Sequence, residues 1–311
     1  MHKVLAYITS YYDENATKSC IKGISSQTYI VNEIFVINNS PKPLNISKAQ
    51  IKSIVVENYP ENIGISGGII KAINFALQNK YDFLWMFDQD SIPASNCLSQ
   101  LLSVFDKYAH KTDLKIGIVA PTPLDTRTGQ IIMPAEFRKD HFEAFTKTNA
   151  DSPYFCDAPI TSGALLHLNA IATVTPPDIR LFIDGIDLDF GLRLSQKGFH
   201  NIVVPSATLY HNFATPIEFN FWGIKKILQR YSALRYYYIC RNHTYLEFKN
   251  SQGFYKLTCI YRRLKVLSIK ALSILLVEHD KKLIKVWACF CGTYYGFRGD
   301  LNRQFNKSVG K

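Results

Sequence analysis

Residues 81–93 of this 311-residue chain, YDFLWMFDQDSIP, limit the possible folds more than any other stretch. Five apolar or aromatic residues in a row, from Phe83 to Phe87, predict a strand buried on both faces of a sheet. The strand ends in Asp88 and Asp90, whose charges need water, a cation or hydrogen-bond donors. At the carboxyl end of a strand in an open α/β sheet, paired carboxylates suit a hard divalent cation that also holds phosphate oxygens. A solvated acidic turn after a core strand is the alternative.

Strand and helix patterns alternate along the first two thirds of the chain. Strands are predicted at residues 3–8, 33–38, 53–57, 116–120 and 201–205, and residues 160–166 form a further apolar stretch. Helices are predicted at 15–27, 61–80 and 94–108, and another helix opens within residues 181–193 and ends near Gly198. Asn15 is the expected N-cap of the first helix, and residues 121–158 are expected to be irregular. The alternation predicts an α/β fold with a mostly parallel central sheet flanked by helices.

Polar side chains follow the first two strands, as they follow the strand that ends at Asp88. The candidates are Thr9, Tyr11, Asp13, Asn38 and Asn39. Because the carboxyl ends of parallel strands meet at one edge, we expect these side chains to form one site for a base and ribose. Each of them alone is more simply a cap or turn residue, and only their joint placement favours a site.

A glycine-rich turn, ENIGISGG, precedes the second helix and could cradle a phosphate at the helix N-terminus. It is not GxGxxG, it follows the third strand, and it lacks the Lys-Ser/Thr of a P-loop. The turn therefore argues against a dinucleotide-dependent dehydrogenase and a P-loop enzyme. Ser162 and Gly163 open the later apolar stretch, where small residues let a ligand approach the backbone closely.

A second acidic cluster, LFIDGIDLDFGLR, contains Asp184, Asp187 and Asp189 within six positions. An aspartate at the start of a helix is commonly a cap, which explains one of the three. His211 follows the strand at 201–205 and is either a satisfied loop histidine or a third metal ligand beside the strand-end carboxylates.

Basic residues are concentrated in the last third of the chain. From Asn220 onward there are 18 Lys and Arg against 4 Asp and Glu, whereas the first 219 residues carry 18 against 21. The segment from Phe221 is expected to be helical, so residues 1–220 and 221–311 are predicted to be separate regions. Basic, aromatic and aliphatic residues mixed in this way suit either a membrane interface or a helical bundle with a solvated face.

The seven cysteines include no CxxC pair, which favours free thiols in a reducing compartment. The N-terminal sequence does not resemble a signal peptide. The best apolar window, residues 266–277, is too short to span a bilayer and contains Lys270. We therefore expect a cytoplasmic protein, peripheral on the inner face of the cytoplasmic membrane.

The ordered set of motifs resembles a known family. The motifs are a strand with T-x-Y, Asn-Asn-Ser, Asn-x-Gly, Asp-x-Asp, Ser-Gly, Asp-x-Asp-Phe-Gly-Leu-Arg and then His, spread over about residues 3–245. Together they resemble the inverting nucleotide-sugar glycosyltransferases of the GT-A fold, glycosyltransferase family two. MFDQDS, FIDGIDLDFGLR and YYYICRNHTYL are similar to phrases of bacterial rhamnosyltransferases, and DLDFGLR is also similar to a stretch of galactofuranosyltransferases.

The resemblance implies a role for each candidate residue. Asp187 matches the catalytic base, and Asp90 would bind a Mn²⁺ or Mg²⁺ ion directly, with help from Asp88 and His211. Asn38 stands where the family usually has Asp. The nucleotide-sugar site would comprise Thr9, Tyr11, Asp13, Asn38, Asn39, Asn62, Gly67, Asp88 and Gln89, and the acceptor site Ser162, Gly163, Asp184, Asp189 and Arg193.

The function implied is metal-dependent, inverting transfer of L-rhamnose from dTDP-rhamnose to a glycan or lipid-linked oligosaccharide. UDP-galactofuranose or another UDP-sugar is the alternative donor, and a homo-oligomer is left open. A polyanion-binding protein without catalysis is a rival hypothesis, but the carboxylate clusters would repel phosphates, so we expect no nucleic-acid partner. A nucleotidyltransferase would usually need a basic, glycine-rich loop near the N-terminus, which the sequence lacks.

Overall fold

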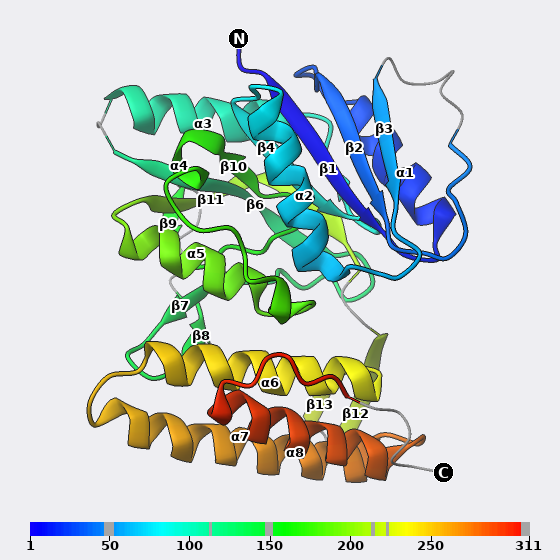
Figure 1. The fold of residues 1–311 in the computed structure, drawn as a ribbon, viewed down its shortest axis with the longest axis vertical. Coiled ribbons are helices and arrows are strands. Elements are labelled where there is room, and N and C mark those ends of the chain that lie inside the picture. Colours follow the sequence, from blue (N-terminus) through cyan, green and yellow to red (C-terminus); the bar gives the residue numbers. More distant parts are fainter. Residues whose placement is uncertain (47–52, 112–113, 147–151, 213–214, 222–223, 306–311) are drawn as a thin grey trace. The chain divides into compact units, whose positions relative to one another are not determined.

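The computed structural model describes residues 1–46, 53–111, 114–146, 152–212, 215–221 and 224–305 (Figure 1). The chain forms two compact units. The N-terminal unit comprises residues 1–136, 144–179 and 186–212, and the C-terminal unit comprises 137–143, 180–185 and 213–311. The boundary expected at residue 220 therefore falls within the C-terminal unit, which also includes two earlier segments.

A nine-stranded sheet forms the centre of the N-terminal unit, in the order β3-β2-β1-β4-β10-β6-β11-β5, with β9 also paired to β11. Its long pairs are parallel, namely β1 with β2 and β4, β2 with β3, and β6 with β11. The shorter strands β5, β9 and β10 pair antiparallel. The strands are β1 (Val4–Ser10), β2 (Glu33–Asn38), β3 (Ile54–Asn58), β4 (Phe83–Asp88), β5 (Ile92–Pro93), β6 (Ile116–Asp125), β9 (Tyr154–Cys156), β10 (Leu165–His167) and β11 (His200–His211).

Helices cover both faces of this sheet. They are α1 (Glu14–Ser25), α2 (Gly64–Gln78), α3 (Cys97–Lys111), α4 (Leu168–Ile171) and α5 (Ile186–Gln196). Side chains of α1 and α3 pack with Phe83, Trp85 and Phe87 of β4, while Phe35 on the other face of the sheet stacks on Phe75 of α2. The predicted α/β fold and the buried strand at residues 83–87 are confirmed.

Several local expectations in this unit are wrong. Asp13, rather than Asn15, caps α1, because its Oδ1 accepts the amide of Ala16 at 2.9 Å. Residues 121–158 are not wholly irregular, since β6 continues to Asp125 and is followed by the hairpin strands β7 (Ala135–Phe137) and β8 (Phe142–Ala144) and by β9. The strand expected at 201–205 extends to His211, which lies at the end of β11 and not on a loop.

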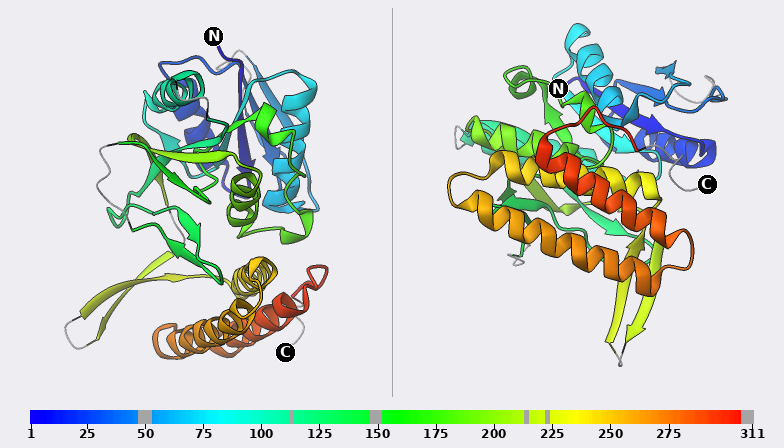
Figure 2. Two further views of the ribbon diagram at one scale, coloured as in Figure 1. Left: turned by 90° about the vertical axis from the view of Figure 1, so that its left-hand side faces the viewer. Right: turned by 60° about the horizontal axis from the view of Figure 1, so that its bottom comes forward.

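The C-terminal unit contains the hairpin β12 (Thr215–Phe221) and β13 (Ile224–Arg230), followed by the helices α6 (Ala233–Asn250), α7 (Tyr255–Val277) and α8 (Lys282–Arg298) (Figure 2). The helix expected from Phe221 therefore begins later, where the Ser232 hydroxyl accepts the Arg235 amide at 3.2 Å. The hairpin replaces the first part of that helix because β13 pairs along its length with β12. A one-turn 3₁₀ helix, η2 (Ile179–Leu181), connects α4 and α5 in the sequence.

Glycines allow α8 to approach α6 closely. A Cβ at Gly292 would lie 2.4 Å from the carbonyl oxygen of Tyr237, and one at Gly296 would lie 2.5 Å from that of Arg241. Among the described residues, none of the helices combines the length and the apolar character needed to cross a bilayer. The seven cysteines are free thiols, and all except Cys291 are buried.

Gly68 allows α2 to pack closely on the sheet, and we predict that a side chain at this position destabilises the fold. A Cβ at this position would lie 2.2 Å from the hydroxyl of Tyr7, which is buried without a hydrogen-bond partner among the described residues. We expect Gly68→Ala to lower the free energy of unfolding by about 1–3 kcal/mol through overpacking, measured by urea unfolding. Tyr7→Phe alone should change it little, and combining the two should recover part of the loss. A Gly68→Ala variant as stable as the unmodified protein would contradict this packing.

Candidate active site

The carboxyl ends of three strands meet at one edge of the sheet. In the β1–β4 pair Thr9 lies opposite Asp88, and in the β1–β2 pair Ser10 lies opposite Asn38. The chain leaves β1 for β2 on one side and reaches β4 on the other, so the strand order reverses here. Ligand crevices of open α/β sheets lie at such reversal points. The predicted common edge is thus observed, while the roles of its residues remain predictions.

Gln89 ties the segment after β1 to the end of β4. Its Oε1 accepts the amide of Tyr11 at 2.6 Å and its Nε2 donates to the Tyr11 carbonyl at 3.0 Å. The backbone of Tyr11 is thereby fixed, while the residue is 50% exposed and its ring meets the ring of Tyr12 edge-on, with centroids 4.5 Å apart. An exposed aromatic ring held by its backbone can stack on a planar base.

The two asparagines that follow β2 hold the backbone in place. Asn38 is fully buried, and its Nδ2 donates to the carbonyl of Lys42 and to Oδ1 of Asn58, both at 2.8 Å. Asn39 links the end of β2 to the start of α2, since its Oδ1 accepts the Ile63 amide at 3.2 Å. These contacts fix the backbone at this edge of the sheet.

The glycine-rich turn before α2 contains residues with positive φ angles, which accounts for part of its sequence. Asn62 adopts φ +57° and its Oδ1 accepts the amide of Gly64 at 3.0 Å, while Gly64 itself adopts φ +74°. Such positive φ angles are accessible chiefly to Gly and Asn. At Gly67 a Cβ would lie 3.0 Å from Cβ of Ile63, so a side chain here would crowd Ile63 and local packing favours glycine.

A buried hydrogen-bond chain connects β4 to the end of β11. Ser91 Oγ lies 2.6 Å from Ser162 Oγ and 2.5 Å from His211 Nδ1, and Ser162 Oγ accepts the amide of Asp88 at 3.1 Å. All three of these polar side chains are at least 94% buried. Ser91 was not among the predicted residues, and its only sequence signal is its place directly after Asp-x-Asp.

The buried His211 lies beside Asp90, whose side chain is partly exposed. His211 Nδ1 is 3.5 Å from Asp90 Oδ1. The same nitrogen lies 2.5 Å from Ser91 Oγ, so His211 would hold an ion through Nε2, or through Nδ1 only once the contact with Ser91 is broken. No group of three or more His, Cys, Asp or Glu side chains placed to hold a metal occurs in the described part of the chain. A Mn²⁺ or Mg²⁺ ion held by this pair would therefore complete its shell with phosphate oxygens and water.

Cys20 is buried close enough to this edge for its thiol to be affected by the site. Burial raises the pKa of the Cys20 thiol well above its usual value, and the charges of Asp88 and Asp90 raise it further. The thiol therefore stays protonated near neutral pH, and Cys20 belongs to the core and not to the chemistry.

Asp187 and Asp189 open α5 in different surroundings. Asp187 borders a small hollow whose other walls are mostly apolar, including Ile69, Met86 and Phe190. Asp189 is buried and pairs with Arg193, whose Nη2 lies 2.8 Å from Oδ2. A carboxylate at the border of an apolar hollow suits proton abstraction.

Arg193 secures the segment before α5. Its Nη1 donates to the carbonyl of Thr175 at 2.6 Å and to the Thr175 hydroxyl at 2.9 Å, while its Nε donates to Asp189 at 2.9 Å. Arg193 and Asp189 therefore hold α5 in place, which fixes Asp187 indirectly.

Other predicted residues have clear structural partners. Gly163 adopts φ +79°, and a Cβ there would lie 2.6 Å from Pro121. Asp184 belongs to the C-terminal unit, where its carboxylate accepts two hydrogen bonds from Arg235 at 3.1 and 3.2 Å. Asn242 of the YYYICRNHTYL stretch donates to the carbonyl of Asp184 at 2.8 Å.

Polar side chains and carboxylates at the reversal point of a mostly parallel sheet are features of the GT-A glycosyltransferase fold, and this chain has both. Residues 2–227 match the model of the family described as Glycosyltransferase like family 2. The match covers well over half of the chain, and the chain belongs to this family.

Curated relatives include galactofuranosyltransferase GlfT1 of Mycobacterium tuberculosis, 24% identical over 206 residues, which are 63% of this chain and 65% of GlfT1. The dTDP-rhamnosyl transferase RfbF of Shigella flexneri is 25% identical over 193 residues, 60% of this chain and 62% of RfbF. The chain thus matches somewhat less than two thirds of the length of these relatives.

Solved structures share the fold at low identity. The crystal structure of GalNAc-T7 with UDP, GalNAc and Mn²⁺ superimposes with a TM-score of 0.58 at 15% identity, covering 98% of this chain and 55% of that one. The structure of TarS from S. aureus gives 0.50 at 13% identity, covering 95% and 44%.

The Gln89 clamp generates the second prediction. We expect Gln89→Ala to remove hydrogen-exchange protection of the Tyr11 amide, because that amide loses its acceptor and becomes free to exchange. Hydrogen exchange read by NMR measures this directly. Gln78→Ala, at an exposed glutamine of α2, is the control and should leave Tyr11 unchanged. Equal protection of Tyr11 in both variants would contradict the clamp.

Proposed function

We propose that this protein is a metal-dependent, inverting glycosyltransferase that moves a sugar from a nucleoside diphosphate to an acceptor hydroxyl. The observation that carries the proposal is the meeting of Thr9, Asp88 and Asn38 at the reversal point of the sheet, with Asp90 and His211 3.5 Å apart. Membership of the family and the activities for which its relatives are named support this class of reaction.

For the donor we propose dTDP-L-rhamnose, with UDP-galactofuranose as the second candidate. The support comes from two kinds of relative, a dTDP-rhamnosyl transferase and a galactofuranosyltransferase. The acceptor would be a glycan or a lipid-linked oligosaccharide of a cell-surface polysaccharide. Free cysteine thiols are consistent with a reducing compartment, so we place the reaction in the cytoplasm.

The donor would lie with its base near the exposed ring of Tyr11 and its diphosphate near Asp90 and His211. A bound Mn²⁺ or Mg²⁺ would offset the charge that gathers on the leaving diphosphate. The nitrogen ligand of His211 favours Mn²⁺ over Mg²⁺. Thr9, Asp88 and the backbone that Asn38 and Asn39 fix would border the ribose.

Asp187 would take the proton of the acceptor hydroxyl as that oxygen attacks C1 of the sugar. The bond from C1 to the diphosphate oxygen breaks on the opposite side, so a single displacement inverts the anomeric centre. Arg193 and Asp189 would act as positioning residues through their hold on α5. Water exclusion by the apolar walls of the hollow would favour transfer over hydrolysis.

The third prediction concerns the base. Asp187→Asn should lower kcat by about 10²–10⁴-fold, the usual contribution of a general base, while the donor Kd changes less than about twofold. Initial rates and isothermal titration separate these two effects. Asp106→Asn, at a partly exposed carboxylate of α3, is the control and should keep full turnover. Normal turnover in Asp187→Asn would show that another group acts as the base.

The fourth prediction concerns the cation and the donor. Binding of dTDP-rhamnose should depend on Mn²⁺ and be lost with EDTA, and Asp90→Asn or His211→Ala should weaken the Mn²⁺-dependent part by about 10–100-fold. Calorimetric titration with dTDP-rhamnose and UDP-galactofuranose, each with and without Mn²⁺, measures how binding depends on the metal and on the donor. UDP-galactose is the control ligand. Equal binding with and without metal would contradict the ion site, and preference for UDP-galactofuranose would replace the first donor by the second.

A further inference from the structure

Helix α7 presents a row of large apolar side chains to the outside of the C-terminal unit. These side chains lie three, four or eight residues apart, on one side of the helix, and are 42–69% exposed. They are Leu257, Tyr261, Leu264, Leu272 and Leu275. The opposite side of the helix is buried and includes Cys259, Leu267, Ile274 and Val277. A soluble helix normally shows polar residues on its outer face, so this outer row indicates a surface that is covered by something apolar.

Helix α8 repeats the pattern. Leu283, Trp287, Phe290 and Tyr294 are spaced by three or four residues and are 49–79% exposed. Tryptophan and tyrosine are the side chains most enriched at the level of lipid head groups. The two rows belong to adjacent helices of one compact unit (Figure 2).

The charges beside these rows are strongly one-sided. Helix α7 contains five Lys and Arg and no Asp or Glu, and residues 254–305 contain ten basic against three acidic residues. Only Arg263 of the five is buried, and it pairs with Glu247 at 3.4 Å. Exposed cations beside an apolar row complement an anionic lipid surface.

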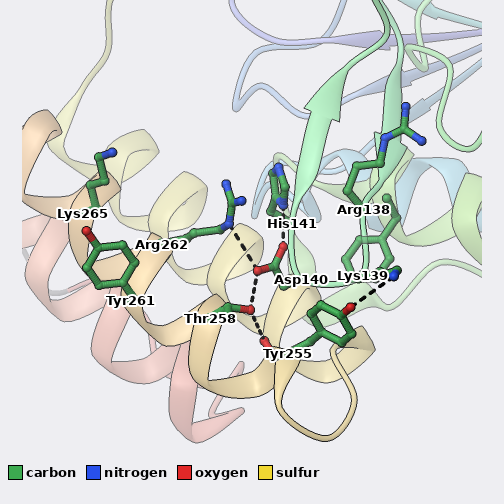
Figure 3. Close-up of a pocket in the computed structure, with 10 residues that line it drawn as sticks. Arg138, Lys139, Asp140, His141, Tyr255, Thr258, Tyr261, Arg262 and Lys265 are labelled. Atoms are coloured by element: carbon green, nitrogen blue, oxygen red, sulfur yellow. Dashed lines mark hydrogen bonds and ion pairs between the residues drawn. The ribbon is translucent and has the colours of Figure 1, made fainter.

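A basic pocket lies between the start of α7 and the turn that joins β7 to β8 (Figure 3). Its volume is about 770 Å³, and it is lined by Arg138, Lys139, Asp140, Tyr255, Arg262 and Lys265, among others. Figure 3 shows Lys265, Arg262 and Tyr261 on the helix and Arg138 and Lys139 on the turn opposite them.

Asp140, the acidic residue of the pocket wall, is already engaged. Its carboxylate accepts hydrogen bonds from Thr258 at 2.5 Å and pairs with His141 at 2.6 Å and Arg262 at 3.2 Å. Burial opposes its ionisation, but the hydrogen bonds from Thr258 and His141 and the charge of Arg262 lower its pKa below the usual value. Asp140 therefore fastens the turn to α7.

Arg138 is likewise paired, with Glu143 at 2.7 Å, and Lys139 donates to the Tyr255 hydroxyl at 3.1 Å. These two side chains and Lys265 are the basic groups of the wall that a phosphate would contact.

We propose that α7 and α8 form a membrane-binding face for anionic lipid, and that the basic pocket holds a lipid head-group phosphate. The apolar rows enter the head-group boundary and the lysines and arginines contact phosphates. A second copy of the chain fits less well, because matching the two apolar rows would bring the basic residues of both copies together. The binding needs neither donor nor acceptor, so it is independent of the proposed transferase activity.

The fifth prediction is tested by sedimentation of the full chain with lipid vesicles at low salt. The protein should bind vesicles that contain about 30% phosphatidylglycerol and should not bind vesicles of pure phosphatidylcholine. High salt should release the protein from the anionic vesicles. Leu272 and Leu276 of α7 are 57% and 66% exposed. Leu272→Asp with Leu276→Asp should weaken binding at least about tenfold, because two exposed apolar side chains of the helix become charged. The matched control is Ile30→Asp with Leu77→Asp, which changes two exposed apolar residues of the N-terminal unit and should bind normally.

The same vesicle sedimentation tests the basic pocket with lysine variants. Lys139→Ala with Lys265→Ala should weaken binding about tenfold, and Lys107→Ala with Lys197→Ala, of equal charge, should not. Inorganic phosphate or glycerol 3-phosphate at millimolar concentration should not displace the protein, because the apolar rows need a bilayer. Absence of vesicle binding would overturn the proposal, as would an equal loss of vesicle binding in the two lysine double variants. A dimer of the unmodified protein that Leu272→Asp with Leu276→Asp converts to monomer would also overturn it.

Discussion

The pairing of β1 with β4 is the constraint on which the arrangement of the N-terminal unit depends. It places Thr9 opposite Asp88, and the pairing of β1 with β2 brings Asn38 to the same edge. Only a strand that is apolar on both faces can fill this central position, and β4 has side chains buried on both faces from Phe83 to Phe87. Since charged groups cannot follow the strand into the core, its carboxylates emerge at the one edge where the strand order reverses.

The aspartates near this edge differ in what holds them. Asp13 caps α1 and Asp189 pairs with Arg193, so part of the role of each is to position the backbone. Asp90 lies beside His211, and Asp187 borders an apolar hollow. Their partners thus distinguish the carboxylates that hold the backbone, Asp13 and Asp189, from those that we propose for the chemistry, Asp90 and Asp187. In the proposed reaction the first group sets the geometry in which the second acts.

The central sheet and its polar edge could be predicted from the sequence, because both follow from short-range patterns. An unbroken apolar run identifies β4, and polar residues directly after a strand identify its carboxyl end. The hairpin of β12 and β13 could not be predicted, because residues 224–230 have helical spacing and only their pairing with residues 215–221 makes them a strand. Nor could the partner of Asp184, since Arg235 is 51 residues away in the sequence. Ser91 was missed for a related reason, because its link to His211 spans 120 residues.

The central claim is that the carboxylates after β4, His211 and Asp187 surround one donor. A crystal structure of the protein with Mn²⁺ and a non-hydrolysable dTDP-rhamnose analogue, with anomalous data collected near the manganese edge, tests it most directly. We expect a manganese peak within about 2.3 Å of a carboxylate oxygen of Asp90 and a ring nitrogen of His211, bridged to the diphosphate. The sugar C1 should face the hollow that Asp187 borders. A peak elsewhere, or a sugar that points away from Asp187, would contradict the claim.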